Sequence, residues 1–254
     1  MIRRRGINKL LSYCYYKFIF IIPLTFADKA IQFNKGIRYT GAPLPPGIRI
    51  MNPFTEFEQT MGIVETFYHK YYSDNYPRHL ILGINPSRLG GGLTGIPFTD
   101  PKRLMAVCEI PYSGRITHEP SSVFMYEMIE AYGGAEAFYK SFYINSPCPL
   151  GFTSVAANGK EINYNYYDSK ELIFAVKDFM IESIRKLIDL GIYTDTCFCL
   201  GTGKNETFLR KLNAEHHFFK KIIPLEHPRF IMQYKNKSKQ FYIDKYLEAF
   251  NSVV

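Results

Sequence analysis

The stretch Arg78-His-Leu-Ile-Leu-Gly-Ile-Asn-Pro-Ser-Arg-Leu-Gly-Gly-Gly92 decides the fold of this chain. Its first half is an apolar run that predicts a buried strand, and the run passes straight into a loop rich in glycine. Glycine lets the backbone approach a ligand closely and leaves N–H groups free to bind it. A nucleotide phosphate loop is the alternative, but it requires Lys followed by Ser or Thr, which is missing here.

Strands and helices alternate along the rest of the chain. Further strands are predicted at residues 142–145, 196–200 and 220–225. Helices are predicted at residues 52–72, 100–108, 121–132, 135–141, 168–190, 204–215 and 238–250. Asn158-Gly159 predicts a hairpin turn within residues 152–166. The alternation indicates an α/β fold, a three-layer α/β/α arrangement with a central, mostly parallel sheet of about four strands.

Polar and glycine residues follow the carboxyl ends of these predicted strands. Asn85, Asn145, Gly201 and His227 all lie at or just beyond a strand end. Open α/β sheets bind their ligands outside the carboxyl ends of their strands. The sequence therefore predicts that these four residues meet at one site.

The chain divides at a segment that resembles a linker, Gly41-Ala-Pro-Leu-Pro-Pro-Gly47. We expect residues 1–50 to form an N-terminal extension and arm, and residues 51–254 to form a single domain. Arginines followed by the apolar run 18–24 resemble a signal peptide, but the run is broken by Pro23 and too short to span a membrane. We expect an accessory or mis-started extension on a cytoplasmic protein, with no membrane partner.

Basic residues gather in two parts of the chain, whose formal net charge is +8. Residues 1–24 hold five Lys or Arg and no acid, and residues 202–245 hold ten against four acids, a local net of +6. Basic residues gathered on one face favour binding to phosphates, although solvated helix faces would give the same count. The five cysteines show no metal-ligand spacing, and their odd number suits a reducing compartment. We expect neither a metal nor a cofactor.

Three segments in order resemble the uracil-DNA glycosylase superfamily, in its single-strand-selective monofunctional branch. The stretch from Gly83 to Phe98 resembles the first motif of that family, in which Asn-Pro is followed by Thr-Gly-Ile-Pro-Phe at this spacing. Phe142-Tyr-Ile-Asn-Ser-Pro-Cys-Pro-Leu150 resembles its base-reading strand, and His227-Pro228 resembles the start of its second motif. The resemblance covers about residues 78–250 and implies a monofunctional DNA glycosylase of a diverged bacterial type.

The resemblance implies a role for each matched residue. Asn85 would orient the attacking water, and His227 would hydrogen-bond the base and stabilise the departing anion. Asn145 would read the base, Phe98 would stack under the flipped ring, and Gly95 would lie beside it. No lysine occupies a motif position that would form a Schiff base, so strand cleavage is not expected.

Two departures from the family pattern bear on specificity and on DNA contact. Ser87 replaces a glycine beside the C5 edge of the pyrimidine, which predicts poorer handling of bulky 5-substituted uracils unless its hydroxyl bonds a polar substituent. The second motif continues as Arg229-Phe-Ile231 instead of Ser-Pro, so these residues are candidates for the wedge that fills the emptied stack. The register of this wedge is left open.

The basic C-terminal third supplies candidate phosphate contacts. Gly201-Thr-Gly203 followed by Lys204 ends a strand and opens a helix, which is a cradle for phosphate. We expect this turn to bind a DNA phosphate. Beside the wedge, we expect further phosphate contacts from Lys235, Lys237 and Lys239. Binding of a free nucleotide at the same turn is the alternative.

Two other functions compete with a DNA glycosylase that acts as a monomer on uracil or a related lesion. A nucleoside or nucleotide N-glycosidase would cleave the same bond in a free metabolite, and it would need neither a wedge nor a basic C-terminal third. A DNA-binding protein that has lost catalysis is the other candidate, and the intact Asn85 and His227 speak against it.

Overall fold

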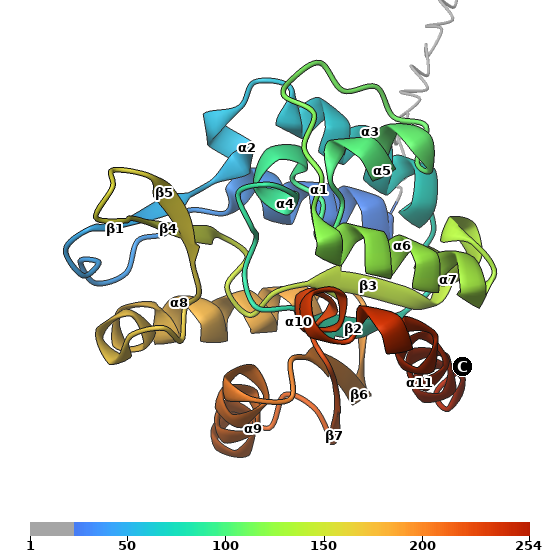
Figure 1. The fold of residues 1–254 in the computed structure, drawn as a ribbon. Helices are drawn as coiled ribbons and strands as arrows, with labels where there is room; N and C mark the ends of the chain where they lie inside the picture. The colour runs from blue at the N-terminus through green and yellow to red at the C-terminus, as the bar shows by residue number, and fades with distance from the viewer. Residues whose placement is uncertain (1–22) are drawn as a thin grey trace, which may run out of the picture.

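Four parallel strands form the central sheet of the computed structural model, which describes residues 23–254 (Figure 1). Their order across the sheet is β3 (Phe142–Asn145), β2 (Arg78–Leu82), β6 (Ile192–Leu200) and β7 (Lys221–Leu225). Every residue of β2 and β3 is buried, as strands covered on both faces require. The expected mostly parallel sheet of about four strands is thus confirmed.

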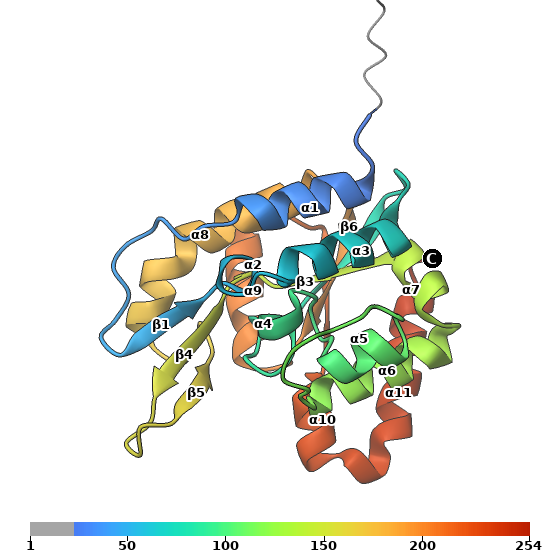
Figure 2. The same cartoon turned by 90° about the horizontal axis from the view of Figure 1, so that it is seen from above.

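Helices cover this sheet on both faces, and Figures 1 and 2 show α8 (Lys170–Ile188) and α6 (Pro120–Tyr132) on opposite sides of it. The other helices are α1 (Phe26–Gly36), α2 (Pro53–Glu56), α3 (Thr60–Tyr72), α4 (Gly91–Thr94), α5 (Pro101–Ala106), α7 (Ala135–Ser141), α9 (Lys204–His216), α10 (Pro228–Tyr234), η1 (Asn236–Ser238) and α11 (Lys239–Asn251).

Local signals in the sequence set the ends of the long helices. Ser169 caps α8, because its hydroxyl accepts a hydrogen bond from the backbone N–H of Leu172. Gly133 ends α6 in the left-handed conformation, with φ 119°, which a side chain would disfavour. These ends agree with the predicted helices to within about two residues.

The predicted helix over residues 52–72 is two helices. Asn52 caps α2 through its side-chain oxygen, which accepts from Phe54 N, and Pro53 occupies the first helical position. Phe57 then adopts an extended conformation, so α2 ends and α3 begins afresh at Thr60. Apolar residues keep a helical spacing on both sides of this break, so the spacing alone did not predict that the helix is interrupted.

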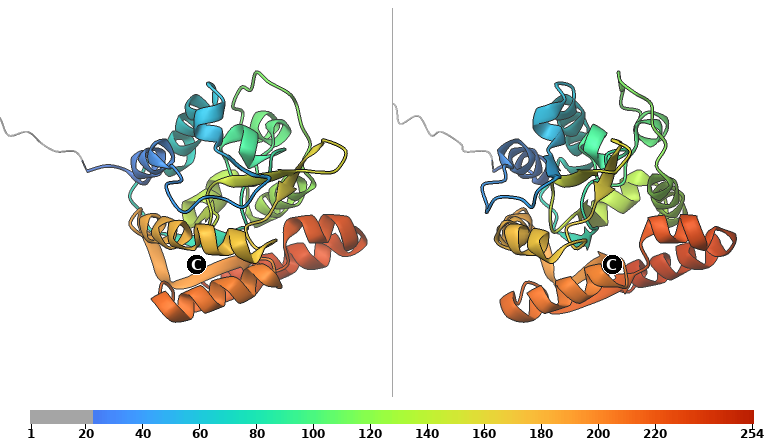
Figure 3. Two further views of the ribbon diagram at one scale, coloured as in Figure 1. Left: turned by 90° about the vertical axis from the view of Figure 1, so that its left-hand side faces the viewer. Right: turned by 60° about the vertical axis from the view of Figure 1, so that its left-hand side comes forward.

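A second, antiparallel sheet lies beside the first and has the order β1 (Ile48–Met51), β4 (Gly151–Val155) and β5 (Glu161–Tyr164) (Figures 2 and 3). The turn at Asn158-Gly159 joins β4 to β5, as predicted, and Gly159 has φ 76°. The pairing of β1 with β4 was not predicted.

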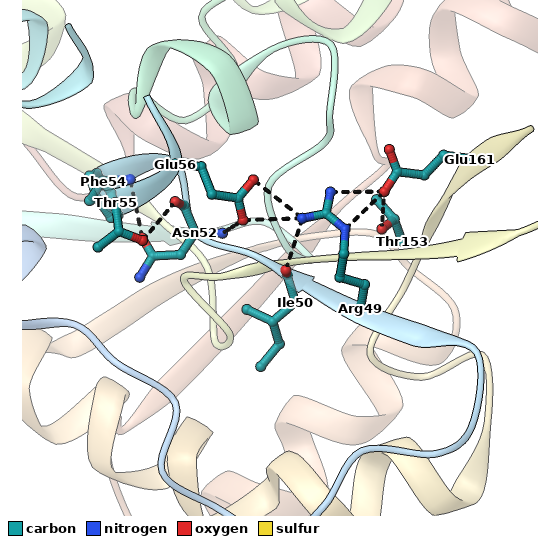
Figure 4. Close-up of polar contacts among 8 residues, drawn as sticks. All are labelled: Arg49, Ile50, Asn52, Phe54, Thr55, Glu56, Thr153 and Glu161. Atoms are coloured by element: carbon teal, nitrogen blue, oxygen red, sulfur yellow. Dashed lines mark hydrogen bonds and ion pairs between the residues drawn. The ribbon is translucent and has the colours of Figure 1, made fainter. Parts of the chain in front are cut away.

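Arg49 ties the β4–β5 hairpin to α2 (Figure 4). Its guanidinium donates to Glu161 on β5 at 2.8 Å and to Glu56 on α2 at 3.3 Å. Thr153 on β4 donates to the same Glu161 oxygen at 2.7 Å. These groups are partly exposed, so the pairs add little stability, but they hold the hairpin against the body of the molecule.

The N-terminal segment from residue 26 onward packs into the body. Phe26, Ala27, Ala30 and Ile31 of α1 are buried in the same core as the central sheet, and β1 pairs with β4. Residues 1–22, with the basic cluster and most of the apolar run of residues 18–24, lie outside the described residues. Among residues 23–254, no helix is both long and apolar enough to cross a membrane.

Candidate active site

The carboxyl ends of the parallel strands open into one pocket of about 480 Å³. The register of the sheet brings these strand ends to the same edge. Leu82 of β2 pairs with Asn145 of β3 and with Cys199 of β6, and Leu200 of β6 pairs with Leu225 of β7. The wall of the pocket comes from the loop after β2, the segment before α6, the loop at the end of β5, and α10. Its lining includes Asn85, Ser87, Phe98, Glu119, Ser146, Asn163, Tyr167, His227, Arg229, Phe230 and Tyr234.

The amide of Asn85 is fixed by the backbone that follows β5. Its Nδ2 donates to the carbonyl of Tyr164 at 3.2 Å, and its Oδ1 accepts from the N–H of Tyr166 at 3.1 Å. Nδ2 also donates to the carbonyl of Pro86 at 3.5 Å. An amide oxygen has two lone pairs, so one acceptor site on Oδ1 remains free. The antiparallel sheet, through the end of β5, thereby orients the Asn85 amide that follows β2 of the central sheet.

His227 carries its proton on Nε2. Its Nδ1 accepts a hydrogen bond at 3.1 Å from the backbone N–H of Arg229, which caps the start of α10. Burial, with a smaller contribution from the nearby Arg229 cation, lowers the pKa of His227 to about 4. The imidazole is therefore neutral near pH 7, and its Nε2–H is a hydrogen-bond donor.

Phe98 forms a flat apolar wall beside this imidazole. Its ring centroid lies 5.6 Å from that of His227, and a Cβ on Gly83 would come within 3.0 Å of the phenyl ring. The backbone of Phe98 has φ 53°, the left-handed region that non-glycine residues rarely adopt. Strain of this kind persists where the surroundings fix a side chain, which fits a ring held in a binding site.

Asn145 is buried at the end of β3, behind the main pocket. Its Oδ1 accepts from the N–H of Ser146 at 2.8 Å, and its Nδ2 donates to the hydroxyl of Tyr143 at 3.1 Å. It lines a small cavity of about 20 Å³ whose wall shares Ser146 with the main pocket. Gly95 also lines this cavity, and its φ of 75° and close contact with Val64 leave no room for a side chain.

The candidate DNA contacts are only partly on the surface. Arg229 and Phe230 are exposed at the rim of the pocket, but Ile231 is fully buried because it faces inward one turn along α10 from His227. Lys235 and Lys237 are exposed, whereas Lys239 forms an ion pair with Glu127 on α6.

The turn before α9 lies close to the pocket rim. Gly201 has φ 120°, and Gly203 is exposed directly before the helix. The ammonium of Lys204 lies 5.8 Å from the ring centroid of Tyr167, which lines the pocket. The structure thus brings the predicted phosphate cradle next to the site.

Several pocket residues were missed in the sequence. Ser146 follows Asn145 directly, and its place at a strand end within the base-reading segment was the available signal. Tyr234 lies one turn beyond Phe230 on α10, and their ring centroids are 5.5 Å apart. Glu119 precedes α6 and has no motif around it, so only the fold brings its carboxyl into the pocket.

Comparison with known proteins matches residues 69–251 to the model of the family described as the uracil DNA glycosylase superfamily. The chain belongs to that superfamily. It is also similar to a solved structure, the wild-type SMUG2 of Pedobacter heparinus, with 74% sequence identity, a TM-score of 0.90, and coverage of 91% of this chain and 99% of that one. No match was found among curated proteins.

Membership of the uracil-DNA glycosylase superfamily confirms the enzyme class predicted from the three motifs. The chain is a DNA N-glycosylase, a hydrolase of base excision repair, and DNA is its substrate. Neither the free-metabolite glycosidase nor the non-catalytic DNA-binding protein is favoured by these similarities.

The environment of His227 predicts how stability depends on pH. The pKa of about 4 in the folded chain lies below the ordinary value of 6.5, so the unfolded chain takes up a proton first as pH falls. Wild type should therefore lose folding free energy relative to His227→Gln as pH falls from 6.5 toward 4. Urea denaturation of both proteins across this pH range measures the difference. Parallel curves of unfolding free energy against pH for the two proteins would contradict the burial of His227.

Proposed function

We propose that this glycosylase excises uracil, or a related deaminated or modified base, with Asn85 and His227 as its catalytic residues. One observation carries the proposal: the oriented amide of Asn85 and the neutral Nε2–H donor of His227 line the same pocket. The pocket volume of about 480 Å³ is within the range that holds small ligands. The reaction initiates base excision repair and leaves the sugar–phosphate strand intact.

His227 stabilises the leaving group. Breaking the N-glycosidic bond puts positive charge on the sugar and negative charge on the departing base, whose O2 becomes an anion. A neutral imidazole already fixed by the start of α10 donates its Nε2–H to this oxygen without reorganisation. A donor held in a partly buried pocket interacts more strongly with the developing charge than one in water.

Asn85 orients the water that attacks the sugar. Since one N–H and one lone pair of its amide are engaged by the backbone after β5, the remaining lone pair on Oδ1 is available to a water hydrogen. An amide is a poor base, so departure of the base runs ahead of water attack. The electron pair of the glycosidic bond leaves with the base, and the water proton passes to solvent.

Asn145 and Phe98 select and hold the base. Asn145 lies behind the pocket wall at Ser146, so the base edge must reach past Ser146 to meet it. There the free N–H of its amide donates to O4 and the free lone pair accepts from N3–H, a pair of groups that uracil offers and cytosine does not. Phe98 stacks on the flipped ring, with Gly83 behind it leaving space for that stack. Ser87 lies near the C5 edge of the base. Gly95 has no side chain, so the cavity wall beside Asn145 can lie close to the base.

The rim of α10 fills the space that the flipped base leaves. Phe230 is 41% exposed and Tyr234 is 65% exposed, and these neighbouring rings project beside the pocket. Exposed aromatic rings stack on bases of any sequence. With Arg229 beside them, they form the wedge, whereas the buried Ile231 contributes only to packing.

Phosphate contacts surround this rim. Lys235 and Lys237 extend from the end of α10, and the turn of Gly201, Gly203 and Lys204 lies beside Tyr167 at the opposite side of the pocket. Lys239 contributes where its ion pair with Glu127 opens. A free-metabolite glycosidase has no use for exposed rings and lysines around the pocket mouth. We further propose that the enzyme acts as a monomer on bacterial chromosomal DNA in the cytoplasm.

We expect Asn85→Ala and His227→Ala each to slow base release by about 10²–10³-fold, as loss of one transition-state contact does. Single-turnover release of uracil from an oligonucleotide with excess enzyme measures the effect. Thermal unfolding of both variants checks that the fold is retained. Phe174→Ala is a matched control, because Phe174 is 83% exposed on α8 and absent from the pocket wall. Near-wild-type rates in both variants would remove these residues from the mechanism.

Exposed lysines around the rim should govern affinity for DNA. Lys237→Ala should reduce the slope of log affinity against log salt by about 0.7–0.9, because one phosphate contact and its released counterion are lost. Lys186→Ala provides the control, since Lys186 pairs with Glu182 on α8 and not with the rim. Binding titrations of an abasic-site oligonucleotide at several salt concentrations give both slopes. Equal slopes for wild type and Lys237→Ala would take Lys237 out of the interface.

A further inference from the structure

The pocket has one carboxylate among the residues described at its wall, that of Glu119. Glu119 stands at the first position before α6, but its side chain makes no capping hydrogen bond to that helix. Its Oε1 instead accepts a hydrogen bond at 2.5 Å from the hydroxyl of Ser87, in the loop after β2. The serine hydroxyl is the donor in this hydrogen bond and the carboxyl oxygen is the acceptor.

The glycine loop is shaped around this carboxylate. A Cβ on Gly90 would overlap Oε2 of Glu119, so the carboxyl rests directly on the backbone of residue 90. A second bond between the two segments runs from the hydroxyl of Thr117 to the carbonyl of Leu89 at 2.6 Å. A side chain at position 90 would therefore displace the Glu119 carboxyl from this place.

Neighbouring groups hold the Glu119 carboxyl in place. The backbone N–H of Glu119 donates to the buried Asp100 at 2.7 Å. Burial raises the pKa of Glu119, and Asp100 raises it further, whereas the bond from Ser87 and the Arg229 cation act in the opposite direction. The carboxyl is thus a built part of the pocket and not a solvated surface charge.

We propose that Glu119 is a positioning residue that sets base specificity by holding the Ser87 hydroxyl as an acceptor. Because the hydroxyl proton of Ser87 is committed to Glu119, only the lone pairs of Ser87 face the pocket. A base whose 5-substituent donates a hydrogen bond gains a partner at this wall. A base with a smaller, apolar 5-methyl group cannot donate to this wall and gains none. The inference rests on the proposed function, in which Ser87 lies at the C5 edge.

The test compares release of uracil, 5-hydroxymethyluracil and 5-methyluracil from single-stranded oligonucleotides under single-turnover conditions. Ser87→Ala removes the hydrogen-bond partner, so the rate for 5-hydroxymethyluracil relative to uracil should fall by about tenfold, the worth of one hydrogen bond. Glu119→Ala frees the Ser87 hydroxyl to rotate without removing it, so the same ratio should fall by less. The double variant should fall no further than Ser87→Ala, because both changes act on one interaction.

Controls separate positioning from folding. Glu130→Gln removes a carboxylate from the exposed end of α6, far along the helix, and should leave the ratio unchanged. Gly90→Ala displaces the Glu119 carboxyl while both polar side chains remain, and should lower the ratio as Glu119→Ala does. Thermal unfolding identifies any variant that fails to fold.

The outcomes distinguish this inference from the function on which it rests. If wild type releases none of the three bases, the proposed function fails. If wild type releases uracil but not 5-hydroxymethyluracil, if the ratio is the same in Glu119→Ala as in wild type, or if the two single effects add in the double variant, the role of Glu119 is overturned and the function stands.

Discussion

Parallel pairing of β2 between β3 and β6 is the constraint on which the site depends. Parallel strands end at the same edge of a sheet, so this pairing places three separate polar segments beside one another. Asn85 follows β2, Asn145 ends β3, and His227 follows β7 on the far side of β6. Complete burial of β2 on both faces makes a register slip costly, and the relative positions of these groups are fixed by the core.

Backbone groups then orient the chemical groups within that frame. The segment after β5 holds both ends of the Asn85 amide, and the first turn of α10 holds Nδ1 of His227. The Asn85 amide is thus positioned by a segment from a distant part of the chain, whereas the His227 imidazole is positioned by the helix that it caps. Such groups need little rearrangement as charge develops in the transition state. In the proposed mechanism the second sheet contributes by positioning Asn85, since Arg49 secures the hairpin that ends beside it.

The sequence predicted the elements better than the contacts between them. Strands at 78 and 142, the long helix α8 and the Asn158-Gly159 turn follow from local periodicity and turn chemistry, which act within a few residues. The pairing of β1 with β4 and the approach of Glu119 to Ser87 join residues far apart in sequence, and no local pattern specifies them. The burial of Ile231 could be predicted only in part from the sequence. It follows from helical spacing, but only once α10 is known to begin at Pro228.

This protein is a glycosylase that hydrolyses the N-glycosidic bond of a flipped base in DNA and leaves the strand unbroken. The most direct measurement incubates an end-labelled oligonucleotide containing one uracil with the protein, quantifies free uracil, and analyses the strand with and without alkali. Deoxyuridine monophosphate is incubated in parallel. We expect release of uracil from DNA, strand breaks only after alkali, and no release from the free nucleotide. Strand breaks without alkali, or release from the nucleotide and not from DNA, would contradict the account.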